Sequence, residues 1–122
     1  MRPAIKAFIR EYERSTTPHP TQRGWRLWRC QVALEVRSCY DQVLLRRILA
    51  VKTNKGRGTA CLRWLLSLVK KHSVEMIGHA SNNFAGKVAK PSVMVLRRWY
   101  KRFGAKFDRH GAFTFTVEGV RL

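Results

Sequence analysis

Apolar residues near the start of the chain recur with the period of a helix. Ile5, Phe8, Ile9 and Tyr12 are spaced i, i+3, i+4 and i+7, and charged residues occupy the opposite side. This spacing predicts an amphipathic helix that ends before Ser15.

A loop and a strand hairpin are expected next. Residues 16–21 contain two prolines, each of which lacks an amide hydrogen and restricts the residue before it, so they predict a loop. From residue 25 to residue 37 the period becomes two, which predicts one strand with a drier and a wetter face. The drier face has Cys30, Val32, Leu34 and Val36, and the wetter face has Gln31, Ala33, Glu35 and Arg37. Residues 38–42 favour a turn into a more apolar strand, 43–51, and the two strands predict an antiparallel hairpin.

The second half of the chain alternates helical and extended patterns. Residues 61–69 are apolar almost all round, which predicts a buried helix. The narrow polar stripe of this helix is Arg63, Ser67 and Lys70. A short strand is expected at residues 74–79, and residues 81–91 have no period and predict a loop.

Residues 92–103 predict a last helix. Its inner row is Val93, Leu96, Tyr100 and Phe103, and its outer side carries the basic i, i+4 pairs Arg97 with Lys101 and Arg98 with Arg102. Gly104 follows the helix as a C′ residue does. Residues 105–107 and 113–117 predict two final strands, which gives the order α, β, β, α, β, α, β, β.

Length and composition indicate one folded domain over residues 1–122. The chain is too short for two hydrophobic cores, and a disordered tail of similar charge would lack its aromatic residues. It has neither an apolar run of membrane-spanning length nor a signal-peptide pattern, so we expect a soluble intracellular protein and no membrane contact. The three cysteines show no spacing typical of a zinc site or a redox pair, so we expect no metal centre.

A glycine-rich turn lies between the second predicted strand and the buried helix. Its sequence is Lys55-Gly56-Arg57-Gly58-Thr59-Ala60. Glycine lets a backbone approach a ligand closely, and the first amides of a helix have no internal partner, so this turn is suited to phosphate oxygens. An ordinary strand-to-helix turn with two glycines is the alternative.

This turn resembles the pyrophosphate loop of the GNAT N-acetyltransferase family, Arg/Gln-x-x-Gly-x-Gly/Ala. Lys55, Gly58 and Ala60 fall on its three defining positions, with lysine in place of the usual first residue. Residues 44–51 are similar to the strand before that loop, and residues 96–104 to a late helix ending in Tyr-x-x-x-Gly. The resemblance covers residues 43–107 and implies an α/β fold, in which helices flank a central mixed β-sheet and the first strand and second helix are shortened or missing.

The resemblance also implies site residues for acetyl-CoA or another acyl-CoA. The turn residues Lys55, Gly56, Arg57, Gly58, Thr59 and Ala60 would hold the pyrophosphate, and the backbone of Leu49, Ala50 and Val51 would bind the pantetheine arm. That arm would lie where this strand parts from residues 74–79, with Asn82 or Asn83 helping to hold it. Tyr100 would protonate the departing CoA thiolate. The alternative for Tyr100 is a core tyrosine, and Ala105 stands where the family usually has an aromatic residue.

Acyl transfer to an amine also needs a base or a water chain to take the amine proton. The candidates are Glu35, Glu75 and His79, with Glu35 first because its strand face is predicted to be wetter. The alternative for Glu35 is a plain salt-bridged or solvated glutamate in an arginine-rich chain.

The charge exceeds what one nucleotide cofactor requires. Lys and Arg number 25 against 7 Asp and Glu, for a formal net charge of +18, which predicts nucleic acid or another polyanion as partner. The candidate nucleic-acid contacts are Arg26, Arg29, Arg97, Arg98, Lys101 and Arg102. Trp25, Trp28 and Trp99 could stack on bases, although tryptophan more often packs in a core.

Three classes of function stay open. The first is an acyl-CoA-dependent transferase acting on nucleic acid, aminoacyl-tRNA or a nucleic-acid-associated protein. The second is a GNAT fold without catalysis that serves in binding or assembly, since the last strands also look like those of small phage virion-associated proteins of this fold. The third is a plain nucleic-acid-binding module whose glycine turn grips backbone phosphate.

Overall fold

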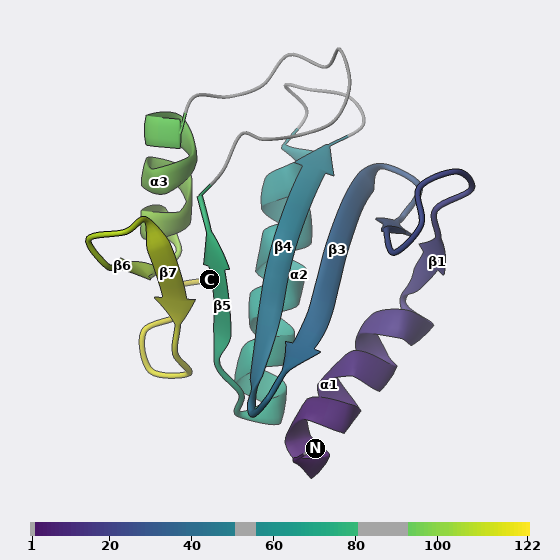
Figure 1. Ribbon diagram of the computed structural model, residues 1–122, viewed down its shortest axis with the longest axis horizontal. Helices are drawn as coiled ribbons and strands as arrows, with labels where there is room; N and C mark the ends of the chain where they lie inside the picture. The colour runs from purple at the N-terminus through teal and green to yellow at the C-terminus, as the bar shows by residue number, and fades with distance from the viewer. Residues whose placement is uncertain (1, 51–55, 81–92) are drawn as a thin grey trace.

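The computed structural model describes residues 2–50, 56–80 and 93–122, which form a mixed α/β structure (Figure 1). Its helices are α1 (Pro3–Arg14), α2 (Arg57–His72) and α3 (Val93–Arg102). Its strands are β1 (Thr16–Pro18), β2 (Arg26–Trp28), β3 (Val32–Cys39), β4 (Gln42–Ala50), β5 (Met76–His79), β6 (Lys106–Phe107) and β7 (Ala112–Phe115).

The strands form one sheet in the order β1-β2-β3-β4-β5-β7-β6. Neighbouring strands run antiparallel except β4 and β5, which are parallel and joined through α2. Their pairing covers Val43 to Leu45 against Met76 to Gly78 and ends there, although β4 continues to Ala50. The two parallel strands therefore share only the first part of β4.

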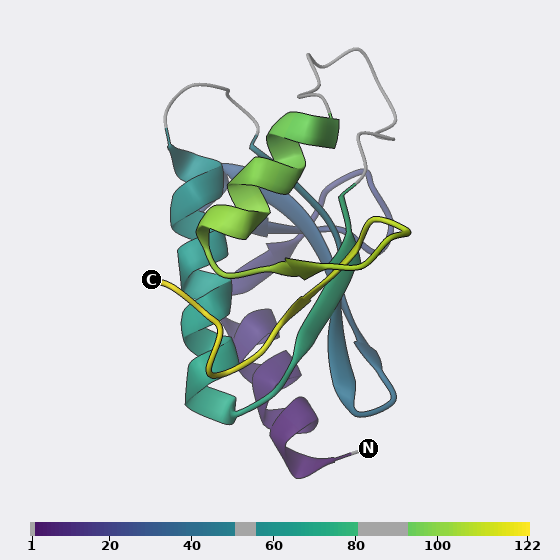
Figure 2. The same ribbon diagram turned by 90° about the vertical axis from the view of Figure 1, so that its left-hand side faces the viewer.

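The three described helices lie on the same face of this sheet (Figure 2). Side chains of β3, β4 and β7 that point toward them are buried, among them Val36, Leu45 and Phe113. The ring of Phe113 stacks on Tyr100 of α3 at a centroid distance of 4.4 Å. A Cβ on Gly78 would lie 2.5 Å from Cζ of Phe113, so this position of β5 requires glycine. The core thus lies between one sheet face and the helices.

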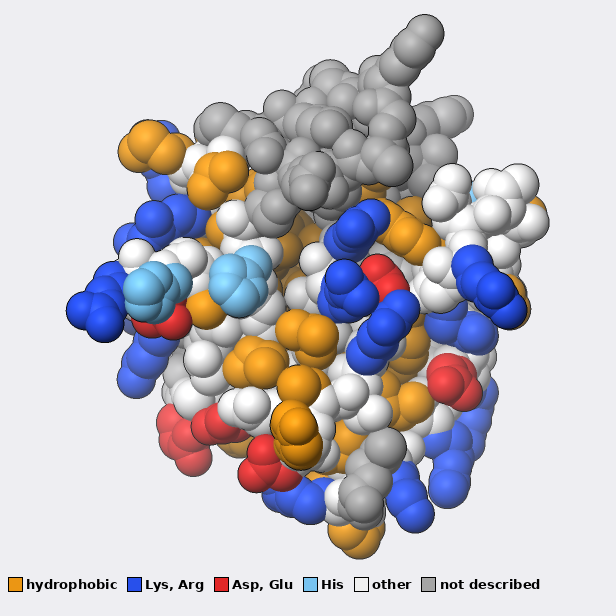
Figure 3. Space-filling model, in the orientation of Figure 1, with side chains coloured by type: hydrophobic (Ala, Val, Ile, Leu, Met, Phe, Trp, Pro, Cys, Tyr) orange, Lys and Arg blue, Asp and Glu red, His pale blue; other side chains and the backbone are white. Residues whose placement is uncertain are grey.

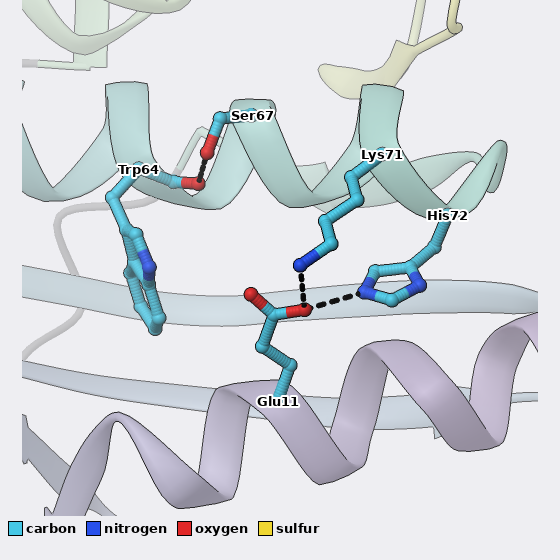
Figure 4. A network of polar contacts seen from close by, with 5 residues as sticks. All are labelled: Glu11, Trp64, Ser67, Lys71 and His72. Carbon is cyan, nitrogen blue, oxygen red and sulfur yellow. Dashed lines mark hydrogen bonds and ion pairs between the residues drawn. The ribbon is translucent and has the colours of Figure 1, made fainter.

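Helix α1 packs against α2 as its apolar stripe predicts. Ile5, Phe8 and Tyr12 are buried, and the ring of Tyr12 lies 6.3 Å from that of Trp64. A polar contact closes the same interface: Oε1 of Glu11 is 2.9 Å from both Nζ of Lys71 and Nε2 of His72 (Figure 4). Deeper in this interface Cys61 is buried, and burial raises the pKa of its thiol to about 12, so it is an inert core thiol at neutral pH.

The predicted single strand over residues 25–37 is wrong. The chain turns at Arg29 and Cys30, which both have left-handed φ angles, 52° and 56°, and it runs back so that Trp28 pairs with Val32. Two consecutive non-glycine residues rarely adopt this conformation, and no glycine or asparagine signals the turn. Residues 16–18, expected as part of a loop, form the short edge strand β1 against β2; Pro18 is tolerated at such an edge.

Two burial predictions also need correction. Ala33 and Glu35 were expected on the wetter face of their strand, but they are 7% and 5% exposed. Val93, expected on the inner row of the last helix, is 39% exposed, whereas Leu96, Tyr100 and Phe103 are buried. The remaining elements agree with the predicted order, and the polar stripe of α2 is exposed.

Neither a membrane-spanning helix nor a metal site occurs within the described ranges. No helix there is long and apolar enough to cross a bilayer. No group of three His, Cys, Asp or Glu side chains there could hold a metal ion.

Candidate functional site

The first backbone amides of α2 make no hydrogen bond within the helix. Gly56 is its N-cap in a left-handed conformation, with φ 67° and ψ 12°, and no side chain of a described residue caps the helix. The amide of Ala60 is the first to bond back, to the Gly56 carbonyl at 3.0 Å, so the amides of residues 57–59 have no partner within the helix. The first turn contains no acidic residue. Free amides and the positive end of the helix dipole together favour an anion here.

Gly58 lies where the ends of β4 and α2 meet α3. A Cβ at this position would be 3.9 Å from Cζ2 of Trp99 and 4.0 Å from Cβ of Ala50, which is ordinary contact. The packing of the protein therefore does not itself require glycine here, and the missing side chain leaves the backbone open to a ligand. Nε1 of Trp99 donates to Oγ1 of Thr59 at 3.0 Å, which ties α3 to the first turn of α2.

The second half of β4 has a partner on one side only, among the described residues. Residues 47–50 pair with β3, and the pairing with β5 ends at Leu45. Leu49 and Ala50 are half-buried and belong to this unpaired edge. Backbone groups at such an edge can accept and donate hydrogen bonds to an extended ligand. The other predicted contacts Val51, Lys55, Asn82 and Asn83 lie outside the described residues.

Tyr100 lies inside an aromatic cluster near this edge. It is 5% exposed, between Phe113 and Trp99, whose ring centroids are 4.4 and 5.0 Å away. Burial raises the pKa of its hydroxyl above the usual value of 10.0, so the group is protonated at neutral pH. The side chain has the protonation state of a proton donor and also the packing of a core tyrosine.

Glu35 is held by arginines. Its Oε2 is 2.6 Å from Nη2 of Arg37 and its Oε1 is 3.9 Å from Nε of Arg46, while its side chain is only 7% exposed. This is the ion-paired alternative to a catalytic base.

The other two base candidates lie at opposite ends of β5. Glu75 precedes the strand, exposed, and accepts a hydrogen bond from Nε2 of Gln42 at 3.0 Å. His79 is the last residue of β5 and is exposed, just beyond the point where β4 and β5 stop pairing. His79 is therefore closest to the unpaired β4 edge in the topology, a placement that sequence order alone did not favour over Glu35.

The predicted nucleic-acid residues divide into two groups. Arg26 is engaged internally: its guanidinium donates to Oγ1 of Thr16 at 2.7 Å and to the carbonyls of Thr16 and Glu13 at 2.9 and 3.0 Å. Arg29 lies over the ring of Trp28 at 4.6 Å. Arg97 lies over the ring of Phe107 at 5.0 Å, whereas Arg98, Lys101 and Arg102 are exposed together on α3. Arg29 is exposed as well, so the accessible part of the predicted set is Arg29, Arg98, Lys101 and Arg102, with Nζ of Lys101 5.8 Å from the ring centroid of Phe107.

The three tryptophans considered for base stacking differ in exposure. Trp28 is 5% exposed and stacks on Trp64 at 5.7 Å, so it belongs to the core. Trp99 is half-buried beside the first turn of α2. Trp25 is half-buried next to Arg47, whose guanidinium carbon lies 5.6 Å from the ring centroid.

Comparison with known proteins yields similarity in structure only. No protein-family profile and no curated protein matches the sequence. The anti-CRISPR protein AcrVA5 superposes with a TM-score of 0.58 at 10% identity, over 71% of this chain and 92% of that one. The ribosomal-protein-S18-alanine N-acetyltransferase from Escherichia coli superposes with a TM-score of 0.52 at 12% identity, over 96% of this chain and 90% of that one. These neighbours are GNAT acetyltransferases, and the likeness extends to the fold.

Proposed function

We propose that this chain, which has the GNAT fold, is an acyl-CoA-dependent N-acyltransferase. The observation that carries the proposal is the uncapped, glycine-containing start of α2 directly beside the unpaired half of β4. The first feature suits a pyrophosphate and the second suits an extended amide-containing arm. Acetyl-CoA contains both groups in one molecule.

Each part of the site has a distinct task in this proposal. The amides of Arg57, Gly58 and Thr59 bind the pyrophosphate oxygens, and the edge of β4 at Leu49 and Ala50 binds the pantetheine amides. An acceptor amine attacks the thioester carbonyl, so a C–N bond forms and the C–S bond breaks. Tyr100 protonates the departing thiolate. The amine proton passes to His79 or to water, because Glu35 is held by Arg37 and Arg46.

The acceptor in this proposal is a nucleic acid, an aminoacyl-tRNA or a protein bound to nucleic acid. The supporting observation is the net charge of +18. Exposed cations on α3, at Arg98, Lys101 and Arg102, lie on the helix that carries Tyr100. A polyanion attracted to this surface would be concentrated near the transfer site.

A second candidate is a GNAT fold without catalysis that binds or assembles through its basic surface, as in a phage virion. The observation in its favour is the burial of Tyr100 in an aromatic cluster, together with the ion-paired state of Glu35. A third candidate is a plain nucleic-acid-binding module. It explains the charge but gives no reason for an uncapped helix start beside an unpaired strand edge.

Calorimetric titration of acetyl-CoA into nucleic-acid-free protein tests the proposal. We expect saturable binding that Gly58→Glu abolishes, because a carboxylate there would repel and block the pyrophosphate. Gly58→Ala is the matched control, since a methyl group at this position makes only ordinary contacts with Trp99 and Ala50. It should fold and bind with a modest loss. No binding by the unmodified protein would overturn the acyl-CoA proposal and leave the two binding functions.

A further inference from the structure

The face of the sheet opposite the helices is covered by no described helix (Figures 1 and 2). Strand register places one residue from each of five strands in a row across this face. The row is Arg37, Leu44, Ile77, Thr114 and Lys106, on β3, β4, β5, β7 and β6. All five are exposed or half-buried, whereas their neighbours Val36, Leu45, Gly78 and Phe113 point to the helices and are buried. The uncovered face thus has an apolar centre with a cation at either side.

A bulge concentrates arginines on this face. Glu35 pairs with Arg47 and Val36 pairs with Leu45, so Arg46 is an extra residue in β4. A bulge turns two successive side chains toward one partner, here Glu35. Arg46 and Arg37 both form ion pairs with Glu35. Arg47 is the residue opposite Glu35 in the β3–β4 register. Two guanidinium groups therefore contact one carboxylate, and a third arginine is its Cα partner on the neighbouring strand, with its guanidinium over the ring of Trp25.

The arginines, not the carboxylate, meet the solvent. The side chains of Arg37 and Arg46 are 55% and 42% exposed, while that of Glu35 is 7% exposed. Figure 3 shows basic side chains gathered over β3 and β4 around an acidic one. One glutamate neutralises one of three charges, so the cluster keeps two unbalanced positive charges. Planar guanidinium groups fixed in this way match phosphate oxygens better than mobile lysines do.

A nucleic acid fits this face better than a second copy of the chain or an acidic peptide. Two copies would each carry +18 and repel one another. A peptide neutralises few charges, whereas a phosphate backbone supplies one at each nucleotide. Trp25, held against Arg47, offers a ring at the edge of the cluster on which a base can stack.

The cluster also lies close to the proposed transfer site. Arg46 and Arg47 precede Leu49 by two or three residues on the same strand, which is roughly 7–10 Å at the rise of an extended chain. A strand of nucleic acid held there would place an amine beside the unpaired half of β4.

We propose that the uncovered sheet face binds the phosphate backbone of single-stranded nucleic acid through Arg37, Arg46 and Arg47. The role of the bound nucleic acid as acyl acceptor rests on the proposed function, whereas the binding of nucleic acid to this face does not. The proposal assigns the main contact to these three arginines rather than to the predicted set, which is Arg26, Arg29, Arg97, Arg98, Lys101 and Arg102.

Fluorescence anisotropy with labelled 20-nucleotide oligo-dT and oligo-rU, without acetyl-CoA, measures this binding. Replacing Arg37, Arg46 and Arg47 together by glutamine should weaken affinity by roughly tenfold or more and reduce the slope of log K against log salt by about 2. The matched control replaces Lys6, Arg10 and Arg14, exposed on α1 behind the sheet, by glutamine. It removes the same charge and should weaken affinity by no more than about threefold.

Several results would overturn the proposal. Equal losses in both triple variants would show that binding follows net charge alone. A loss confined to the triple variant of Arg98, Lys101 and Arg102 would assign the contact to α3. Displacement of the oligonucleotide by poly-L-glutamate at equal charge concentration would favour an acidic protein partner.

Two measurements keep the test decisive. If the sheet triple variant does not fold by circular dichroism, Arg46→Gln alone changes one exposed bulge side chain and should reduce the salt slope by about 0.7. Titration of acetyl-CoA into the same variant separates the two proposals. Retained acetyl-CoA binding with lost oligonucleotide binding supports both, and retained binding of both ligands rejects the sheet face while keeping the acyl-CoA site.

Discussion

Gly78 shows how one residue sets the spacing at the centre of the sheet. A Cβ there would lie 2.5 Å from Cζ of Phe113 and 2.6 Å from the backbone oxygen of Leu45. Since a backbone atom cannot move away as a side chain can, Gly78→Ala should destabilise the fold by about 1–3 kcal/mol or more. Urea denaturation measures this, with Gly58→Ala as the tolerated control. Equal stability of Gly78→Ala and the unmodified protein would contradict the packing described for β5.

The hydroxyl of Tyr100 can be removed without removing the ring, so its role in catalysis can be measured apart from the role of the ring in packing. Tyr100→Phe keeps the stacking on Phe113 and removes only the hydroxyl. Its free energy of unfolding should therefore change by no more than about 1 kcal/mol. If Tyr100 donates a proton to the thiolate, acyl transfer should fall by roughly 100-fold or more.

Release of free CoA thiol, measured with a thiol reagent, follows that turnover. Tyr100→Leu is a useful comparison because it removes the stacking as well and should lower stability. Turnover that survives Tyr100→Phe would assign the residue to the core alone.

At the scale of elements, the contact between α1 and α2 gives the stability a pH dependence. Hydrogen bonds from Lys71 and then His72 lower the pKa of Glu11 below its usual 4.5. A carboxyl whose pKa is lower in the folded state stabilises the fold at pH values above 4.5, and this contribution is lost as the pH falls through the folded value. Glu11→Gln should therefore cost about 0.5 kcal/mol near pH 7 and almost nothing near pH 3.

Thermal unfolding at both pH values, with Glu13→Gln on the same helix as control, measures this difference. Glu13 is exposed and forms no ion pair among the described residues, so its replacement should have little effect at either pH. A cost for Glu11→Gln that is the same at both pH values would indicate packing rather than charge.

Periodicity predicts correctly those elements in which the apolar side chains are also the buried ones. The predicted amphipathic helix α1 and the predicted buried helix α2 are both confirmed, because the apolar side chains of each pack into the core. The turn at Arg29 and Cys30 could not be predicted, because its left-handed conformation is favoured only by the pairing of β2 with both β1 and β3. The burial of Glu35 escaped prediction for a similar reason, since Arg46 reaches it only through a bulge.

At the scale of the whole molecule, all three described helices lie on one face of the sheet. The charged side chains of the other face are therefore exposed side by side. The glycine turn at residues 55–60 was predicted from local sequence, and its described part, from Gly56 on, begins α2. The arginine cluster on the opposite face brings together residues 35, 37, 46 and 47 from two strands. Only the register of β3 and β4 makes them neighbours, so the order of basic residues along the chain favoured Arg26, Arg29 and the basic residues of α3 instead.

The net charge of +18 should also make stability depend on ionic strength. With 25 basic residues against 7 acidic ones, repulsion among cations exceeds the attraction of the few ion pairs. Salt screens this repulsion, so raising NaCl from 10 to 300 mM should raise Tm by roughly 4 °C, which corresponds to about 1 kcal/mol. Differential scanning fluorimetry on nucleic-acid-free protein measures the shift.

The triple glutamine variant of Arg37, Arg46 and Arg47 locates this repulsion. If the sheet cluster is one of its main sources, the variant should gain less stability from added NaCl than the unmodified protein. The α1 variant of Lys6, Arg10 and Arg14, whose charges are spread along one helix, should keep most of the salt dependence. A Tm that falls as salt is added would instead mean that the ion pairs of Glu11 and Glu35 outweigh the repulsion among the cations. The arginines around Glu35 would then serve to stabilise the fold rather than to bind an anion.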